Sequence, residues 1–377
     1  MKKTRNQFSN KLIVIYLILS LTILSTHYTF LYSGERKLKE KYTHKVIINL
    51  PIGKQKGEFW SIPKGYHETH DIHLSGGFTL DQEGNIYLGD STNQRILKAN
   101  DNGKFIKQLK VGVEFEFLAV DKQNNLYVSW TERIEGKKVR FNHYVNKYNQ
   151  EGKPIKTFPS WHKVVNDAWN NIFVLIEGTE HNIDGYLYNP YTDQHKFKDI
   201  IKIKEDGQKY KEYVNNLDKE GNGYVVEGGY ERYVNKNINP IGKYYEPRPV
   251  IVKVYNPDRK LNREIILEDT TEFLLSSIMF GIDKYDNLYF LGMSEENREM
   301  LSKDYRKVER ENDLMVKFDK NGKVIALIKI AVKYYPIEYR FFVDKEGNIY
   351  HINLKGYSGG DDERKEGFKI IKYEMTK

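Results

Sequence analysis

The sequence predicts an all-β fold, a six-bladed β-propeller built from four-stranded antiparallel blades. One short pattern recurs six times along the 377 residues: an apolar strand, a tight turn that begins with Asp and ends with Asn, and a second strand with an aromatic residue at a fixed place. Successive copies are 40 to 65 residues apart. Because about 40–45 residues form one four-stranded blade, this spacing fits a propeller whose longer repeats carry insertions.

The residues of the turn explain the pattern. An Asp side chain accepts a hydrogen bond from the backbone two residues further on, and Gly or Asn tolerates a positive φ. Six equivalent aspartates at six turns indicate a structural role, so we do not assign them to catalysis. They define repeats 1 to 6 and are Asp81, Asp121, Asp167, Asp218, Asp283 and Asp344.

A second strand–turn–strand unit follows these hairpins, for example at residues 96–106 and 145–155, with Asn-Gly or Glu-Gly at the turn. Each repeat therefore supplies four strands, but the last repeat ends after its third. We predict that an N-terminal strand near residues 45–50 supplies the missing outer strand and closes the last blade, which leaves no open edge between the first and last blades. A stray strand is the alternative.

The first copy of the pattern runs from Asp81 through Gly84 and Asn85 into the stretch Asn93–Ile96. In these residues the chain resembles the NHL-repeat family of propellers, and the resemblance covers roughly residues 45–377. It implies the fold and not the activity, since that family includes binding platforms and enzymes alike.

The first residues differ from the rest in composition. Four Lys or Arg residues precede an uncharged run of 22 residues, which is about the length of a membrane span. We predict one N-terminal hydrophobic helix, a signal anchor that crosses the cell membrane once with the propeller outside the cytoplasm. A cleaved signal peptide and a secreted propeller are the alternative. The predicted parts are a basic tail (1–11), the anchor or signal peptide (12–33), a linker (34–43) and the propeller (44–377).

Cysteine and charge restrict the function. The chain has no Cys, which excludes disulfides, thiolate metal sites and cysteine nucleophiles. An exported domain without disulfides fits a bacterial cell surface. The net charge is +8, but residues 1–41 carry +6 of it. The propeller therefore lacks the basic excess typical of nucleic-acid binding, and we expect a monomeric propeller with no nucleic-acid partner.

Turn lengths distinguish the two ends of the ring. The Asp turns and most of the Asn-Gly and Glu-Gly turns are tight and lie at one end, the turn end. The insertions fall at the opposite end, the loop end. Insertions collected on one face of a repeat protein mark its binding face. They are residues 178–199, 228–249, 293–312 and 356–367.

Two of these insertions are rich in tyrosine, a residue favoured in recognition surfaces because it combines a large contact area with a polar group. The candidate binding residues are Tyr186, Tyr188, Tyr191, Tyr230, Tyr244 and Tyr245. Packing of these rings onto their own blades is the alternative.

Alignment of the repeats gives a second set of candidates. Positions four and five residues before each repeated Asp precede the innermost strands and should surround the mouth of the central channel. They include Glu116, His162, Tyr213, Tyr339 and Arg340. This mixture suits a carboxylate-bearing ligand, or a metal ion together with histidines upstream of the first blade. Polar side chains in a wet channel are the alternative.

One histidine-rich segment precedes the first blade. Imidazoles and carboxylates are the donors that zinc and similar ions prefer, so the segment supports at most one divalent metal ion as cofactor. The spacing does not match His-Glu-x-x-His on a helix, and a solvated polar loop is the alternative. The candidate metal ligands are His67, His70, His73 and His162.

Two classes of function follow. The first is a membrane-anchored extracytoplasmic platform that binds a peptide, glycan or protein partner through the loop end. The alternative is a metal-dependent propeller enzyme, a lactonase-like hydrolase or lyase with its site at the channel mouth. No nucleophile elbow, phosphate loop or nucleotide fingerprint occurs in the sequence. The sequence therefore does not identify the catalytic residues of such an enzyme.

Overall fold

A computed structural model gives the arrangement of the strands. It describes residues 38–50, 77–134, 140–159, 161–176, 189–191, 200–203, 209–212, 216–228, 249–258, 260–268, 273–294, 313–330, 341–354 and 368–376. The chain divides into two units, Met1–Lys39 and Glu40–Lys377, and every strand belongs to the second. Across these ranges no helix is long and apolar enough to cross a membrane. The predicted helix at 12–33 lies outside them.

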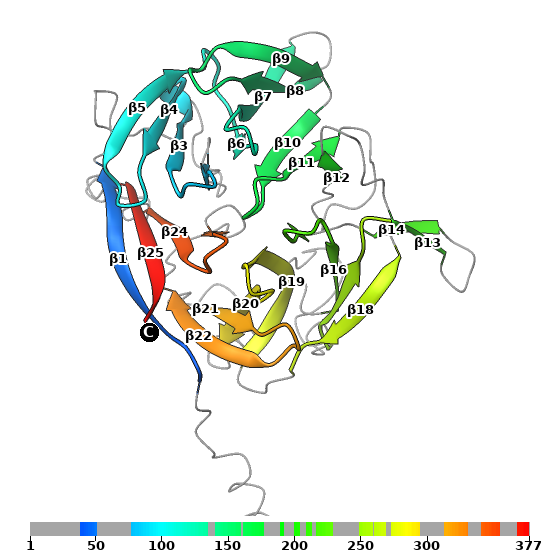
Figure 1. Ribbon diagram of the computed structural model, residues 1–377. Coiled ribbons are helices and arrows are strands. Elements are labelled where there is room, and N and C mark those ends of the chain that lie inside the picture. The colour runs from blue at the N-terminus through cyan, green and yellow to red at the C-terminus, as the bar shows by residue number, and fades with distance from the viewer. Residues whose placement is uncertain are drawn as a thin grey trace, which may run out of the picture. The chain divides into compact units, whose positions relative to one another are not determined.

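Five four-stranded antiparallel sheets are the blades of a β-propeller, and they radiate about a common centre (Figure 1). The first blade consists of β2 (Phe78–Leu80), β3 (Ile86–Asp90), β4 (Arg95–Ala99) and β5 (Phe105–Lys110), with a 3-10 turn η1 (Ser91–Asn93) between β3 and β4. The second blade consists of β6 (Phe117–Val120), β7 (Leu126–Ile134), β8 (Arg140–Tyr148) and β9 (Pro154–Pro159).

Repeats 4 and 5 form two further blades. The blade of repeat 4 consists of β15 (Asn216–Leu217), β16 (Gly223–Glu227), β17 (Ile251–Tyr255) and β18 (Leu261–Ile266). The blade of repeat 5 consists of β19 (Phe273–Ile282), β20 (Leu288–Ser294), β21 (Asp313–Phe318) and β22 (Val324–Ile330). In these four blades the strands pair in chain order, as the repeated hairpins predict.

The third repeat corrects the prediction of six four-stranded blades. Among the residues that the structure describes, its sheet has three strands, β10 (Trp161–Asn166), β11 (Ile172–Ile176) and β12 (Asn189–Tyr191). A separate two-stranded sheet follows, made of β13 (Ile200–Ile203) and β14 (Lys209–Glu212). Pro190 lies in the middle of β12 and has no N–H to donate, which disfavours a further strand beside it.

The closing blade confirms the prediction for the N-terminal strand. It consists of β23 (Phe341–Val343), β24 (Ile349–Leu354), β25 (Phe368–Thr376) and β1 (Lys41–Leu50). β1 occupies the outer position and pairs with β25 from Lys41↔Thr376 to Leu50↔Phe368. The sequence analysis placed this strand near 45–50, and it begins four residues earlier.

The repeated aspartates have the structural role that the sequence predicts. In all six turns the carboxylate accepts a hydrogen bond from the backbone N–H two residues further on, at 2.9–3.0 Å. The Asn four residues further on also donates its side-chain amide to it, at 2.8–2.9 Å. These hydrogen bonds make the six carboxylates part of the turns at the turn end.

The hydrophobic core lies between neighbouring blades. Ile96 and Leu109 of the first blade pack with Leu118, Val120 and Leu126 of the second. Equivalent clusters join repeats 4 and 5, repeats 5 and 6, and the closing and first blades. The faces that meet in these clusters are buried, which leaves the strand ends as candidate surfaces for function.

Candidate functional site

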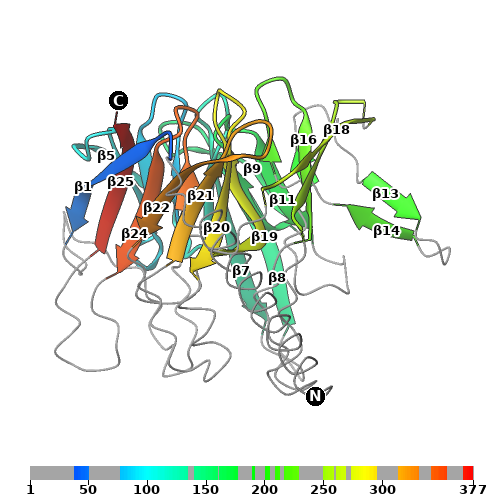
Figure 2. The same cartoon turned by 90° about the horizontal axis from the view of Figure 1, so that it is seen from below.

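The second blade has a ribbon that extends past its inner strand. β7 and β8 pair over nine residues, from Leu126↔Tyr148 to Ile134↔Arg140, whereas β6 pairs with β7 only as far as Ser129. The last five residues of β7 therefore continue as a two-stranded ribbon about 17 Å long, at roughly 3.4 Å per residue. Figure 2 shows β7 and β8 reaching beyond the neighbouring strands. The ribbon points to the loop end, because the Asp121 turn lies at the other end of β7.

A chain of three polar side chains lies at the base of this ribbon. Thr131 Oγ1 donates to Glu116 Oε1 at 3.0 Å and lies 3.0 Å from Nδ1 of His143. The Thr131 hydroxyl has one proton, so it accepts at His143, and Nδ1 of the imidazole carries the proton. The strand pairing sets this geometry, since Thr131 lies directly opposite His143.

The opposite face of the ribbon carries stacked aromatic rings. Trp130 and Tyr144 lie opposite each other, with ring centroids 4.7 Å apart and planes 21° apart. Tyr144 donates its hydroxyl to Glu132 at 3.2 Å and accepts from Asn142 at 3.3 Å. These contacts link side chains of β7 and β8 across the ribbon.

Exposed apolar side chains lie at the outer part of the ribbon. Ile134 is 40% exposed and Phe141 is 53% exposed. Arg133, opposite Phe141, is also exposed. Exposed Ile134, Phe141 and Arg133 therefore lie together on the ribbon at the loop end, with the Glu116 carboxylate at its base, a combination typical of recognition surfaces.

The described ranges contain few of the residues that the sequence singled out. Glu116 precedes β6 as predicted and is exposed. His162 lies within β10 rather than before it, and β10 packs against β6, β7 and β8. Tyr191 lies in β12. The others fall outside the described residues, namely His67, His70, His73, Tyr186, Tyr188, Tyr213, Tyr230, Tyr244, Tyr245, Tyr339 and Arg340.

Sequence reasoning missed Thr131 and His143. Neither stands in a motif, and both become site candidates only because strand pairing places them beside Glu116. The signal that could have found them is the length of the alternating pattern in residues 126–134, which continues past the point where the blade's inner strand begins.

The turn of repeat 3 lies across the inner strands of two other blades. The buried Asn170 side chain donates to Leu80 O at 2.8 Å and to Val120 O at 3.0 Å. Gln82 of the first blade donates to Trp169 O at 3.3 Å. A ligand approaching these strands from the turn end would have to displace these hydrogen bonds. This geometry favours the loop end as the functional end.

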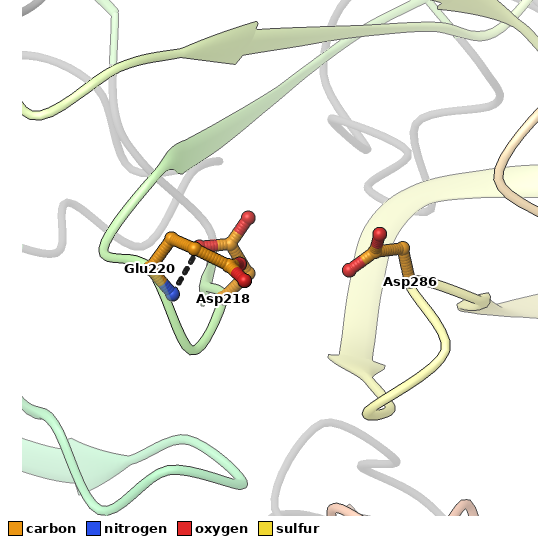
Figure 3. Close-up of side chains that lie close together, drawn as sticks. All are labelled: Asp218, Glu220 and Asp286. Carbon is orange, nitrogen blue, oxygen red and sulfur yellow. Dashed lines mark hydrogen bonds between the residues drawn. The ribbon is translucent and has the colours of Figure 1, made fainter.

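One group of three carboxylates lies at the turn end, between repeats 4 and 5. Oxygen atoms of Asp218, Glu220 and Asp286 lie within 4.8 Å of one another, which among the described residues is the single group of this kind. Figure 3 shows Asp218 and Glu220 on one turn and Asp286 on the next. Burial, and then the charges of Asp218 and Glu220, raise the pKa of Asp286. Carboxylate oxygens suit a hard cation such as Ca²⁺.

This cluster is separate from the predicted histidine ligands, which precede the first blade or lie in β10. The sequence signal was the Asp at position 286, where most repeats have Gly or Asn. Arg263 partly balances the cluster, since its charge lowers the pKa of Asp286. Asp218 is also hydrogen-bonded by Asn222 and Tyr224. These contacts account for the position of Asp218 as part of its turn.

Comparison with protein-family models and with curated proteins finds no match. Solved structures that are similar to the chain include a virginiamycin B lyase from Staphylococcus aureus, at 9% identity over 88% of this chain and 99% of that one, with a TM-score of 0.38. A calcium-binding regucalcin from Agrobacterium tumefaciens is 10% identical over 80% and 90%, with a TM-score of 0.39. A gluconolactonase from Xanthomonas campestris is 11% identical over 80% and 86%, with a TM-score of 0.37. Likenesses of this size carry no argument about what this chain does.

Proposed function

We propose that this protein is an extracytoplasmic binding platform that holds a peptide, glycan or protein partner at the loop end of its propeller. The three-stranded sheet of repeat 3 then stands as the sixth, incomplete blade, and residues 12–33 as the membrane anchor. The observation that supports the proposal is the β7–β8 ribbon. It extends past its blade and carries Thr131, whose side chain is hydrogen-bonded to His143 on the ribbon and to Glu116 at its base.

A binding role fits the chemistry of the ribbon. Its polar side chains are held by one another, and exposed apolar side chains flank them at Ile134 and Phe141. Such a surface gives contact area and directional hydrogen bonds at low cost in conformational entropy, because the strands are already paired. The sequence analysis predicts that the tyrosine-rich insertions lie at the same end of the ring.

The test is a screen of the purified full chain against a glycan array and a library of random ten-residue peptides. A ligand that binds at the ribbon should bind at least tenfold more weakly to the Glu116→Ala and His143→Ala variants. Glu151→Ala is the matched control, because Glu151 is an exposed acid at the turn end of the same blade. A ligand that binds all four proteins equally well would contradict the assignment of the ribbon.

The second candidate is a metal-dependent hydrolase or lyase. The observation that favours it is the presence of side chains of the kind that bind metal ions, namely His143 with Glu116 beside Thr131, and the carboxylate cluster at the turn end. The ion would be held at His143 and Glu116, or by the carboxylate cluster. Its chemistry would be Lewis-acid activation of a bound carbonyl or water.

Elemental analysis of the full chain, before and after a chelator wash, distinguishes the two candidates. About one tightly held divalent ion per chain, lost from His143→Ala and kept by Asp286→Asn, would favour the enzyme at the loop end. The reverse pattern would place the ion in the carboxylate cluster. A chain that binds its ligand equally well after the wash would favour the platform.

A further inference from the structure

The ribbon has an open edge along β7. On the side where β6 ends, Ser129 O accepts a hydrogen bond from Glu116 N at 2.8 Å. Backbone direction alternates with a period of two residues, so the N–H and C=O groups of Thr131 and Arg133 point to the same edge. Among the strands that the structure describes, none pairs with them there. A row of such groups is a template for another strand.

The side chains beside this edge define what strand would fit. The Glu116 carboxylate lies at the base of the edge, hydrogen-bonded to Thr131. Arg133 lies two residues further along β7 on the same face and is exposed. A strand antiparallel to β7, as β6 is, would have its C-terminal end near Glu116. An acidic residue of that strand would pair with Arg133, and a basic residue two positions later would pair with Glu116.

Apolar contacts are available on both faces of the ribbon. Phe141 shares the face of Arg133, because the two residues are directly opposite each other. Ile134 lies on the other face, beyond the stacked Trp130 and Tyr144. A strand added at this edge can therefore bury one residue against each face, as alternate side chains do in strand addition.

We propose that the open edge of β7 binds an extended peptide of about four residues by strand addition. The peptide runs antiparallel to β7 and carries the pattern acidic–x–basic toward its C-terminal end. This inference rests on the proposed binding function and names its ligand class. Backbone hydrogen bonds to Thr131 and Arg133 supply the affinity, and Glu116 and Arg133 supply the direction and the register.

The test compares two substitutions at one position. Thr131→Pro removes the outward N–H of the edge, and proline is tolerated on an edge strand where no ladder bond is lost. Thr131→Val is the matched control, because it also removes the hydroxyl but keeps the N–H. Peptides are selected from a library of random ten-residue sequences on the full chain, and their affinities are then measured for both variants. Hydrogen exchange of the Arg133 amide is measured with and without peptide.

Strand addition predicts three results. Selected peptides carry the acidic–x–basic pattern, bind Thr131→Pro about tenfold more weakly than Thr131→Val, and slow the exchange of the Arg133 amide at least tenfold. One backbone hydrogen bond accounts for a change of that size. Equal affinities for the two variants, or an Arg133 amide whose exchange does not change, would overturn the inference and leave a peptide platform with another site. Selection of glycans alone would overturn strand addition and leave the proposed binding platform standing. Selection of no ligand at all would overturn both proposals.

Discussion

Among the six repeated aspartates, Asp167 has different partners from the other five. Asp81 accepts a hydrogen bond from Tyr87 at 3.2 Å and lies 3.1 Å from the ammonium group of Lys98. In the same way, a Tyr six residues further on donates to Asp121, Asp218, Asp283 and Asp344. In repeat 3 that position is Phe173, and the residue opposite is Pro190. Burial without these partners raises the pKa of Asp167 to about 6.

This difference predicts that Asp167 contributes to the pH dependence of stability. The pKa of Asp167 is higher in the folded chain than the usual value near 4, so the folded chain binds more protons between about pH 4 and 6. The free energy of unfolding therefore falls as the pH rises through this range, by at most about 3 kcal/mol. Urea unfolding at pH 4 to 7 measures it. The Asp167→Asn variant should lose this part of the pH dependence.

Phe173→Tyr is the complementary variant. Its hydroxyl would supply the hydrogen bond that the other five aspartates receive, and it should lower the pKa of Asp167. We expect a smaller fall in stability between pH 5 and pH 7 than in the parent chain. A fall of equal size in the parent, Phe173→Tyr and Asp167→Asn proteins would show that Asp167 is not its source.

At the scale of single elements, two glycines hold the same place in two turns and differ in their surroundings. Gly84 and Gly347 both have positive φ, +81° and +84°. A Cβ at Gly84 would lie 3.6 Å from the nearest side chain, whereas one at Gly347 would lie 2.4 Å from the hydroxyl oxygen of Tyr289. Because the backbone conformation is the same at both positions, Ala substitutions at Gly84 and Gly347 distinguish the cost of a positive φ from the cost of a steric contact with Tyr289.

The matched substitutions should therefore have different effects. Gly84→Ala should lower the free energy of unfolding by about 1 kcal/mol, because alanine disfavours positive φ. Gly347→Ala should lower it by about 2–4 kcal/mol, since the contact between repeats 5 and 6 must also shift. Denaturant unfolding of the two variants measures the difference. Equal losses would mean that Tyr289 moves aside without cost.

The closing strand allows a second comparison within one element. Ile48 is 5% exposed and packs with Leu97 and Ala99 of the first blade, whereas Val46 on the same strand is 52% exposed. Ile48→Ala should lower the free energy of unfolding by about 2–4 kcal/mol, and Val46→Ala by less than about 0.5 kcal/mol. Thermal unfolding checks both. Similar values for the two variants would contradict the role of β1 as a packed strand.

For the whole molecule, the two-unit division predicts where truncation becomes harmful. Glu40 donates its N–H to Ile325 O at 3.2 Å and pairs with Lys317 at 2.7 Å, and β1 follows directly. A chain that begins at Glu40 should keep the parent Tm. A chain that begins at Pro51 loses the outer strand of the closing blade, and its Tm should fall by 10 °C or more. Calorimetry of the two truncated chains measures this, and equal Tm values would show that β1 is dispensable.

The sequence predicted more of the fold than of the site. Turn chemistry is local, so the Asp turns, the paired strands and the missing outer strand near 45–50 could be read along the chain. The three-stranded sheet of repeat 3 could not be predicted in this way, because the number of strands depends on where Pro190 lies within the sheet. The site depends on strand pairing, which joined Glu116 to Thr131 and His143. The remaining predicted site residues stay predictions.

The closing blade also sets an order of events during synthesis. Thr376 donates its side-chain hydroxyl to Lys41 O across 335 positions of sequence, so among the strands that the structure describes β1 emerges first and β25 last. Until then both ends of the array expose strand edges, and pairing over such a distance is slow to form. Nascent chains therefore pass through an unclosed form that can pair with copies of itself, and factors that cover strand edges before release would raise the yield of the folded protein.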